Sequence, residues 1–259
     1  MVGTPPPGRP PVAAVPTGTV PVPDLVRSVL PGRLLHPVWR NEAGGLTWRT
    51  DDAGPARHVK WAPRGAAALD VPAEAERLRW LAGRVVVPEV VAVEHDDGGT
   101  VLVTATLPGR SAVDPRWLAA PEVAVAAVGR GLRALHDALP VEGCPFSWTA
   151  EDRLARLRPD VPAGVRARLR DVPDVDRLVV AHGDACMPNT LLDDDGRPVA
   201  HVDVGALGVA DRWADLAVAS WSTAWNVGRG YEDLLLEAYG VGRDDARVTY
   251  YRELWDASP

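Results

Sequence analysis

The chain has 259 residues, of which 46% are apolar, enough for one large domain or two lobes with cores of their own. A net charge of −7 argues against a nucleic-acid-binding protein, and the lack of any apolar run of 18 residues argues against a membrane protein. The sequence shows no secretory signal of the usual kind, in which basic residues are followed by an apolar block. Two cysteines are too few for a disulfide framework, so we expect a reduced, cytoplasmic protein.

The N-terminal part of the chain reads as a proline-rich tail followed by a small β-rich lobe. Residues 1–23 contain eight prolines and predict a flexible tail. A nucleotide-binding lobe is expected over 24–106, beginning with a short helix from Asp24 to Leu30. Asp70 as N-cap and Pro72 in the first turn predict a second helix over about 73–83. The alternating patterns predict strands at Pro37–Arg40, Leu46–Thr50, Arg57–Trp61, Val90–His95 and Thr100–Thr106.

The remainder, 107–259, reads as a mainly helical lobe that begins after Pro108-Gly109. An apolar stripe at helical spacing runs from Val125 to Leu139, and further helices are expected at Ala214–Val227 and Tyr231–Tyr239. One hairpin interrupts them, turning at Asp194-Asp195-Gly196. The expected strands here are 178–180, Thr190–Leu192 and Val199–Val202.

Lysine usage singles out one residue. Of the 28 basic residues 27 are Arg, and Lys60, at the end of a predicted strand, is the one Lys. A single lysine kept in a chain that otherwise uses arginine suggests that this position needs a compact point charge, for example to reach phosphate oxygens.

The strongest chemical signal is the pattern His-x-Asp-x4-Asn over 182–189, followed by Asp203 at the end of the hairpin. Phosphoryl transfer needs a carboxylate to orient the attacking hydroxyl and oxygen ligands to hold magnesium against the phosphates. Asp184 and Asn189 provide one of each, and Asp203 provides a second, anionic magnesium ligand. The pattern therefore predicts an enzyme of phosphoryl transfer.

The strings HGDACMPN and VDVGALGVADRWADLA resemble the aminoglycoside phosphotransferase family, especially its kanamycin-kinase (3′-phosphotransferase) branch. The strings VKWAP, AEAERLRWLA, PGRSA and GLRALHDALPVEGCPF extend the resemblance over roughly residues 36–255. It implies an α+β, protein-kinase-like fold of two lobes, with a small β-rich N-terminal lobe and a larger, mainly helical C-terminal lobe. It also implies Mg²⁺ and ATP or GTP as phosphoryl donor.

The resemblance also implies roles for single residues. Asp184 matches the catalytic aspartate, and Asn189 and Asp203 match the magnesium ligands. Lys60 matches the lysine that contacts the triphosphate, and Glu74 matches its ion-pair partner, with Glu76 as a rival. The hinge that pairs with the base edge of the nucleotide corresponds to Ala105, Thr106 and Leu107.

Other residues near the motif have simpler interpretations. The pair Gly44-Gly45 lies where the family covers the phosphates, although a hairpin turn explains it equally well. His182 is expected to shape the loop by hydrogen bonds, and Asp211 and Asp215 to brace it or cap a helix. Cys186 lacks a base to activate it and is expected to pack.

Three features depart from the family on the acceptor side. Ala206 stands where relatives have Arg, the segment from Phe146 to Leu178 is short, and the chain ends in a different tail. The acids that remain as candidate contacts of a cationic acceptor are Glu151, Asp152, Glu232, Asp233 and Asp256. Residues 106–259 hold 24 acidic and 17 basic side chains, which favours a cationic acceptor in this part.

We therefore expect a phosphotransferase with an alcohol group as acceptor, most plausibly an aminoglycoside, and hence a role in antibiotic resistance. Two alternatives remain open. The acceptor could be a nucleoside antibiotic or another sugar-like or amino-alcohol metabolite, or the protein could be a non-catalytic nucleotide-binding regulator. No nucleic-acid or membrane partner is expected.

Overall fold

The computed structural model describes residue 16 and residues 18–41, 44–50, 52, 54–66 and 69–258. The tail predicted for 1–23 lies mostly outside these residues. The chain divides into two compact units, which pass into one another at Pro108 and Gly109. The N-terminal unit holds the described residues up to Gly83 together with Val87–Pro108, and the C-terminal unit holds Arg84–Val86 and the residues from Gly109 on. Within the described residues, no helix has the length and apolar character needed to cross a membrane.

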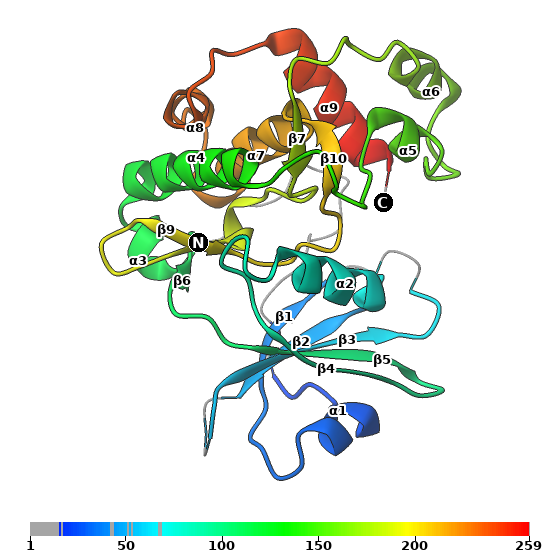
Figure 1. Cartoon of the computed structure of the whole chain (residues 1–259), viewed down its shortest axis with the longest axis vertical. Helices are drawn as coiled ribbons and strands as arrows, with labels where there is room; N and C mark the ends of the chain where they lie inside the picture. Colours follow the sequence, from blue (N-terminus) through cyan, green and yellow to red (C-terminus); the bar gives the residue numbers. More distant parts are fainter. Residues whose placement is uncertain are drawn as a thin grey trace. The chain divides into compact units, whose positions relative to one another are not determined.

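The N-terminal unit is built on one antiparallel sheet of five strands in the order β1-β2-β3-β5-β4 (Figure 1). The strands are β1 (His36–Arg40), β2 (Leu46–Thr50), β3 (Arg57–Pro63), β4 (Val90–His95) and β5 (Gly99–Ala105). All five strands were predicted to within two residues.

The two faces of this sheet carry different helices. Helix α1 (Asp24–Val29) lies against β4 and β5 on one face, and α2 (Val71–Leu81) lies against β3, β4 and β5 on the other (Figure 1). Because side chains alternate along a strand, Val59 packs into the core that contains Val26 of α1, whereas the next residue, Lys60, faces α2. The sheet therefore directs its one lysine toward a helix.

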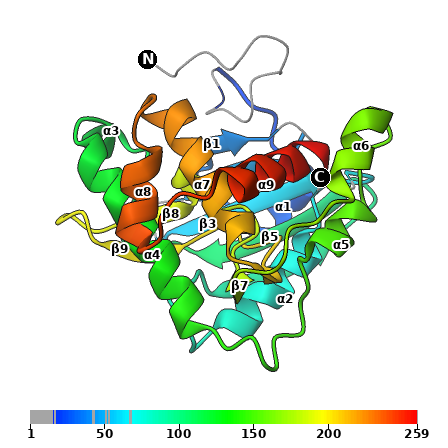
Figure 2. The same ribbon diagram turned by 90° about the horizontal axis from the view of Figure 1, so that it is seen from above.

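The C-terminal unit is mainly helical (Figure 2). Helix α4 packs on α8 so closely that a Cβ on Gly129 would lie 2.5 Å from the backbone oxygen of Leu235. Helix α7 packs beside α9. The helices are α3 (Pro115–Leu118), α4 (Pro121–Ala138), α5 (Ala150–Leu154), α6 (Ala163–Leu169), α7 (Trp213–Asn226), α8 (Glu232–Tyr239) and α9 (Asp245–Ala257).

Two small sheets lie among these helices. One pairs β7 (Leu178–Ala181) with β10 (Gly208–Asp211), antiparallel. The other has the order β6-β8-β9 and contains the predicted hairpin. Its strands are β6 (Arg110–Ser111), β8 (Thr190–Leu192) and β9 (Pro198–His201), and a 3₁₀ turn, η1 (Met187–Asn189), precedes β8.

Several elements of the C-terminal unit have no counterpart in the sequence-based expectation. Helix α9 is the longest of them, and Asp244 caps it by accepting the N–H of Arg247 at 3.0 Å. Strand β7 is also less buried than predicted, because Leu178 is 47% exposed while the two valines after it are buried. The other unpredicted elements are α3, α5, α6, β6 and β10.

Candidate active site

The segment 182–189, here called the catalytic loop, follows directly after strand β7 and is held by a buried carboxylate from helix α7. Asp215 accepts the backbone N–H of His182 at 2.6 Å and that of Gly183 at 2.9 Å. It also accepts Nε2 of His136, from helix α4, at 2.9 Å. Asp215 and both histidines are buried. The start of the loop is thus fixed to two helices by charge-assisted hydrogen bonds.

The expected bracing role therefore belongs to Asp215. Burial alone would raise the pKa of Asp215, but the hydrogen bonds from His136 and from the backbone of His182 outweigh burial, and the net pKa is lowered. Asp211 acts elsewhere, because it accepts the backbone N–H groups of Trp213 and Asp176 at 2.8 and 2.5 Å. It shapes the start of α7 and the chain before β7.

The imidazole of His182 organises the loop from inside. Its Nε2 donates to the backbone oxygen of Val202 at 3.0 Å, and its Nδ1 accepts the N–H of Asp184 at 3.3 Å. One histidine thereby joins the catalytic loop to the end of the β8–β9 hairpin. The His182 side chain has no exposed surface, so its role is to hold the loop in shape.

The glycine of the motif is required by space as well as by backbone angle. Gly183 has a φ of +85°, and a Cβ there would lie 2.2 Å from the backbone oxygen of Ala206. Ala206 thus contacts the catalytic loop through its backbone.

Asp184 and Asn189, five residues apart in the loop, contact each other. Nδ2 of Asn189 donates to the backbone oxygen of Asp184 at 2.9 Å and to its Oδ2 at 3.1 Å. Oδ1 of Asp184 is buried and has no hydrogen-bond partner among the described residues. Since buried polar atoms are rarely left unpartnered, this oxygen marks a position where a further group is expected.

The second carboxylate close to this loop is Asp203. Among the residues that the structure describes, it is the one non-glycine residue with positive φ, at 61°. Such backbone conformations cost about 1–3 kcal/mol and persist where the surrounding structure imposes them, often at functional sites. Burial, and next the negative charge of Asp203, raise the pKa of Asp184.

These three residues fit a hard cation. Asn189 uses its amide nitrogen toward Asp184, which leaves the amide oxygen as the atom able to ligate. A cation would offset the repulsion between the Asp184 and Asp203 carboxylates. The described residues contain no cluster of three or more His, Cys, Asp or Glu side chains able to hold a metal by themselves. Mg²⁺ typically takes one or two protein carboxylates and completes its shell with phosphates and water.

Cys186 lies inside the loop as a packing residue. Burial, and then the charge of Asp184, raise the pKa of its thiol well above the ordinary value. The thiolate, which is the nucleophilic form, is thereby disfavoured. Cys144 and Cys186 are both free thiols.

In the N-terminal unit, Nζ of Lys60 lies 2.6 Å from Oε2 of Glu74. Lys60 comes from β3 and Glu74 from the first turn of α2, which Asp70 caps by accepting the N–H of Ala73. The Glu74 side chain is 9% exposed and that of Lys60 is 22% exposed. The rival partner, Glu76, is exposed and so points away from the sheet.

The predicted hinge residues are partly used by the protein itself. The N–H of Ala105 donates to the backbone oxygen of Glu89 at 2.9 Å, and that of Thr106 to Ala56 at 3.2 Å. Thr106 also contacts Nδ1 of His58 through its hydroxyl, at 3.0 Å. Within the described part of the chain, the N–H of Leu107 has no such backbone acceptor. It is therefore the hinge donor most open to a ligand.

Two of the five candidate acceptor contacts lie at the start of helix α5. Asp152 belongs to a capping box, where its carboxylate accepts the N–H of Thr149 at 3.0 Å and the hydroxyl of Ser147 at 2.5 Å. Its pKa is lowered, first by the Ser147 hydrogen bond. The adjacent Glu151 is exposed. Asp152 is thus committed to its helix, and Glu151 points to solvent.

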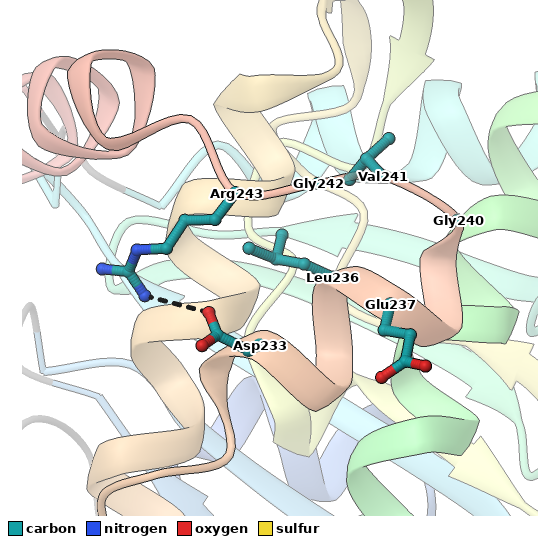
Figure 3. Close-up of a pocket in the computed structure, with 7 residues that line it drawn as sticks. All are labelled: Asp233, Leu236, Glu237, Gly240, Val241, Gly242 and Arg243. Carbon is teal, nitrogen blue, oxygen red and sulfur yellow. Dashed lines mark hydrogen bonds and ion pairs between the residues drawn. The ribbon is translucent and has the colours of Figure 1, made fainter.

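Two more candidates, Glu232 and Asp233, are engaged in ion pairs. Arg243 lies 3.1 Å from Glu232 and 3.3 Å from Asp233, and Arg252 lies 2.9 Å from Glu232. Figure 3 shows the Arg243–Asp233 pair at the edge of a shallow pocket formed by α8 and the segment after it. That pocket includes no residue of the catalytic loop.

The fifth candidate, Asp256, lies in α9 directly after Trp255, which contacts two tryptophans of α7. These tryptophans, Trp221 and Trp225, were not singled out from the sequence. Their spacing of four residues within a predicted helix could have indicated a shared face. His136 was also missed as a partner of Asp215, because no local pattern links residues on two separate helices.

Comparison with known proteins agrees with this geometry. Residues 41–251 match the phosphotransferase enzyme family. An aminoglycoside 3′-phosphotransferase from Streptomyces fradiae is 34% identical over 263 residues, covering 89% of this chain and 97% of that protein.

Solved structures give the same result. The crystal structure of an aminoglycoside-3′-phosphotransferase of type VIII has a TM-score of 0.73 and 31% identity, covering 90% of this chain and 96% of the other. The aminoglycoside phosphotransferase APH(3″)-Id from Streptomyces rimosus, in complex with ADP and streptomycin, has a TM-score of 0.67 and 28% identity, covering 89% and 94%. These likenesses confirm the predicted α+β, protein-kinase-like fold and the predicted enzyme class. The chain belongs to the phosphotransferase enzyme family.

Proposed function

We propose that this enzyme transfers the γ-phosphoryl group of a nucleoside triphosphate, ATP or GTP, to the 3′ hydroxyl of an aminoglycoside. The observation that carries the proposal is the unpartnered, buried Oδ1 of Asp184 in a loop that also presents Asn189. Relatives at 34% and 28% identity are named for 3′ and 3″ phosphorylation of aminoglycosides. Such an activity would confer antibiotic resistance.

Asp184 is the proposed catalytic residue. Its carboxylate would accept a hydrogen bond from the acceptor hydroxyl and orient it toward the phosphorus. Burial, and then the charge of Asp203, raise its pKa. Asn189 would hold the carboxylate in place through its 3.1 Å contact with Oδ2.

Asn189 and Asp203 are the proposed Mg²⁺ ligands. The ion would supply charge neutralisation on the phosphate oxygens during transfer. The backbone of Asp203 adopts a positive φ, and His182 links the adjacent residue, Val202, to the catalytic loop through its backbone oxygen. This link would keep Asn189 and Asp203 at a constant distance from each other.

Lys60 is the proposed triphosphate contact, and Glu74 positions it. A lysine held at 2.6 Å by a nearly buried carboxylate has lost most of its side-chain freedom. It can therefore offer a fixed positive charge without a further entropic cost on binding. The N–H of Leu107 would donate to the edge of the base, since those of Ala105 and Thr106 already have protein acceptors.

Of the five acids considered for the acceptor, we propose Glu151, whose side chain is exposed, as a contact of its ammonium groups. Asp152 is occupied as a helix cap, and Glu232 and Asp233 are paired with arginines. At least three of the five acids are thus engaged within the protein itself.

The direct test is a coupled assay of nucleotide turnover across a panel of aminoglycosides, nucleoside antibiotics and amino alcohols, with ATP and GTP. Wild type should phosphorylate an aminoglycoside, and Asp184→Asn should lower kcat by about a hundred- to ten-thousand-fold while nucleotide binding persists. If only a nucleoside antibiotic or an amino alcohol is phosphorylated, that compound is the acceptor and the aminoglycoside assignment is wrong. Binding of nucleotide without any turnover would favour the regulator.

A further inference from the structure

Helix α7 has one face against the catalytic loop and a neighbouring face of tryptophans. Ser222 accepts the N–H of Met187 at 2.9 Å, and Asn226 donates to Ser222 at 3.1 Å. Trp221 and Trp225 each come one residue earlier in the same helix. At about 100° per residue, Trp225 lies roughly 60° around the helix from Ser222. The aromatic face therefore adjoins the face that contacts the loop bearing Asp184.

Trp255 of α9 completes this group, here called the tryptophan cluster (Trp221, Trp225 and Trp255). The ring centroids lie 4.8 Å apart for Trp221 and Trp225, 5.6 Å for Trp225 and Trp255, and 6.2 Å for Trp221 and Trp255. All three side chains are partly exposed. Packing of the rings against each other fixes their orientation, so the cluster is a rigid surface with apolar area still open to water.

The cluster already holds one cation. The guanidinium of Arg252 lies 5.5 Å from the ring centre of Trp221, and the same guanidinium contacts Glu232 at 2.9 Å. Glu232 offsets the charge of this arginine. A cation is therefore favourable at the face of these rings, as expected from the negative potential of an indole face.

We propose that the tryptophan cluster is the surface on which a ring of the amino-sugar acceptor stacks, with Trp225 as the central contact. This inference rests on the function proposed above. A sugar ring presents a face of C–H groups and, in an amino sugar, ammonium groups beside it. An indole favours both, through burial of apolar area and through cation–π attraction.

The position of the cluster favours the acceptor over other ligands. A nucleotide would bring a polyanion to a part of the chain with 24 acidic and 17 basic side chains over residues 106–259. An amino sugar has the complementary charge. Helix α7, which carries Trp221 and Trp225, also contacts the loop with the proposed base through Ser222, and the reacting hydroxyl must come to this loop.

The test compares Trp225→Leu and Trp255→Leu with Trp225→Phe, which keeps an aromatic face. The matched control is Trp80→Leu, a partly exposed tryptophan of α2 with no assigned role. Calorimetry should show acceptor Kd rising about tenfold in the two leucine variants, which corresponds to about 1.4 kcal/mol. Acceptor KM should rise in parallel, while kcat and nucleotide KM stay within about threefold. Trp225→Phe and Trp80→Leu should stay within threefold in acceptor Kd.

A measurement on the wild-type chain covers the case in which a leucine variant does not fold. Fluorine NMR of fluorotryptophan-labelled protein, assigned with single phenylalanine variants, should show acceptor-dependent shifts for Trp225 and Trp255 but not for Trp80. Unchanged resonances, or an unchanged acceptor Kd in Trp225→Leu, would overturn the stacking surface and leave the phosphotransferase intact.

Other results point elsewhere. Wild-type protein that neither binds nor phosphorylates any aminoglycoside would overturn both the proposed function and this inference. A wild-type dimer that Trp225→Leu converts to a monomer by light scattering, with acceptor Kd unchanged, would assign the cluster to self-association.

Discussion

Oδ1 of Asp215 accepts the backbone N–H of Gly183 at 2.9 Å, which ties helix α7 to the residue directly before Asp184. The same helix contacts the loop again through Ser222. The position of the proposed base is thus set by α7 rather than by the loop alone.

Asp215→Asn should therefore lower both stability and turnover. Three donors, from His136, His182 and Gly183, now share the two carboxylate oxygens of Asp215. Asn has one side-chain oxygen, so a buried donor is left without an acceptor. Loss of that contact and of the charge should cost about 3 kcal/mol. We expect kcat to fall at least tenfold with little change in nucleotide KM, measured alongside chemical unfolding.

Asp211→Asn is the matched control. Burial raises the pKa of Asp211, whereas the net pKa of Asp215 is lowered. Asp215 thus contributes stability above the unfolded-state pKa of about 3.8, and that stability is lost as the pH falls below it. Because the pKa of Asp211 is raised, its ionised form is disfavoured in the folded protein. Replacing Asp211 by a neutral residue should therefore lower the free energy of unfolding less than replacing Asp215. Equal losses of kcat in the two variants would contradict the claim that Asp215 in particular positions the catalytic loop.

Asp203→Ala should weaken magnesium-dependent nucleotide binding more than Asn189→Ala. Asp203 offers a formal charge and two oxygens, whereas Asn189 offers one neutral oxygen. Titration of nucleotide at several magnesium concentrations measures the difference. A larger defect in Asn189→Ala would reverse the assigned roles.

The sequence predicted which residues the loop presents better than it predicted what supports the loop. Asp184, Asn189 and Asp203 follow a local pattern with a hairpin of recognisable length. The pairing of Lys60 with Glu74 was expected mainly from the family resemblance, and Lys60 lies within β3 rather than at the expected strand end. The contact between His136 and Asp215 joins residues 79 positions apart on two helices, and no local spacing reveals such a pair.

Helix α9 escaped prediction for a related reason. Its buried side chains include the adjacent pair Tyr250 and Tyr251, which widens the buried face beyond a single stripe. Charged and polar residues fill the remaining positions, so the apolar period is weak. The partnership of Trp255 with Trp221 and Trp225 depends on this helix and was therefore also missed.

Lys60→Arg should impair the enzyme although the charge is kept. A planar guanidinium cannot reproduce the 2.6 Å contact with Glu74 in the same space. We expect nucleotide KM to rise or kcat to fall at least tenfold. Because Lys60 is the one lysine of the chain, acylation followed by mass spectrometry reports on it directly. Nucleotide with magnesium should slow its labelling, and equal labelling with and without nucleotide would place Lys60 outside the nucleotide site.

Acceptor binding should weaken as salt rises, because the acidic excess over residues 106–259 attracts a cationic ligand. Screening shortens the reach of exposed charges to about 10 Å at 0.1 M ionic strength. The acceptor KM should therefore increase with salt, and nucleotide KM, measured in the same series, should respond differently because the ligand charge is opposite. Glu151→Gln should reduce the salt slope for the acceptor. Asp97→Asn, which changes an exposed acid of the N-terminal unit paired with Arg64, should leave that slope unchanged. An acceptor KM that ignores salt would argue for a neutral acceptor, with the assignments of Asp184, Asn189 and Asp203 unaffected.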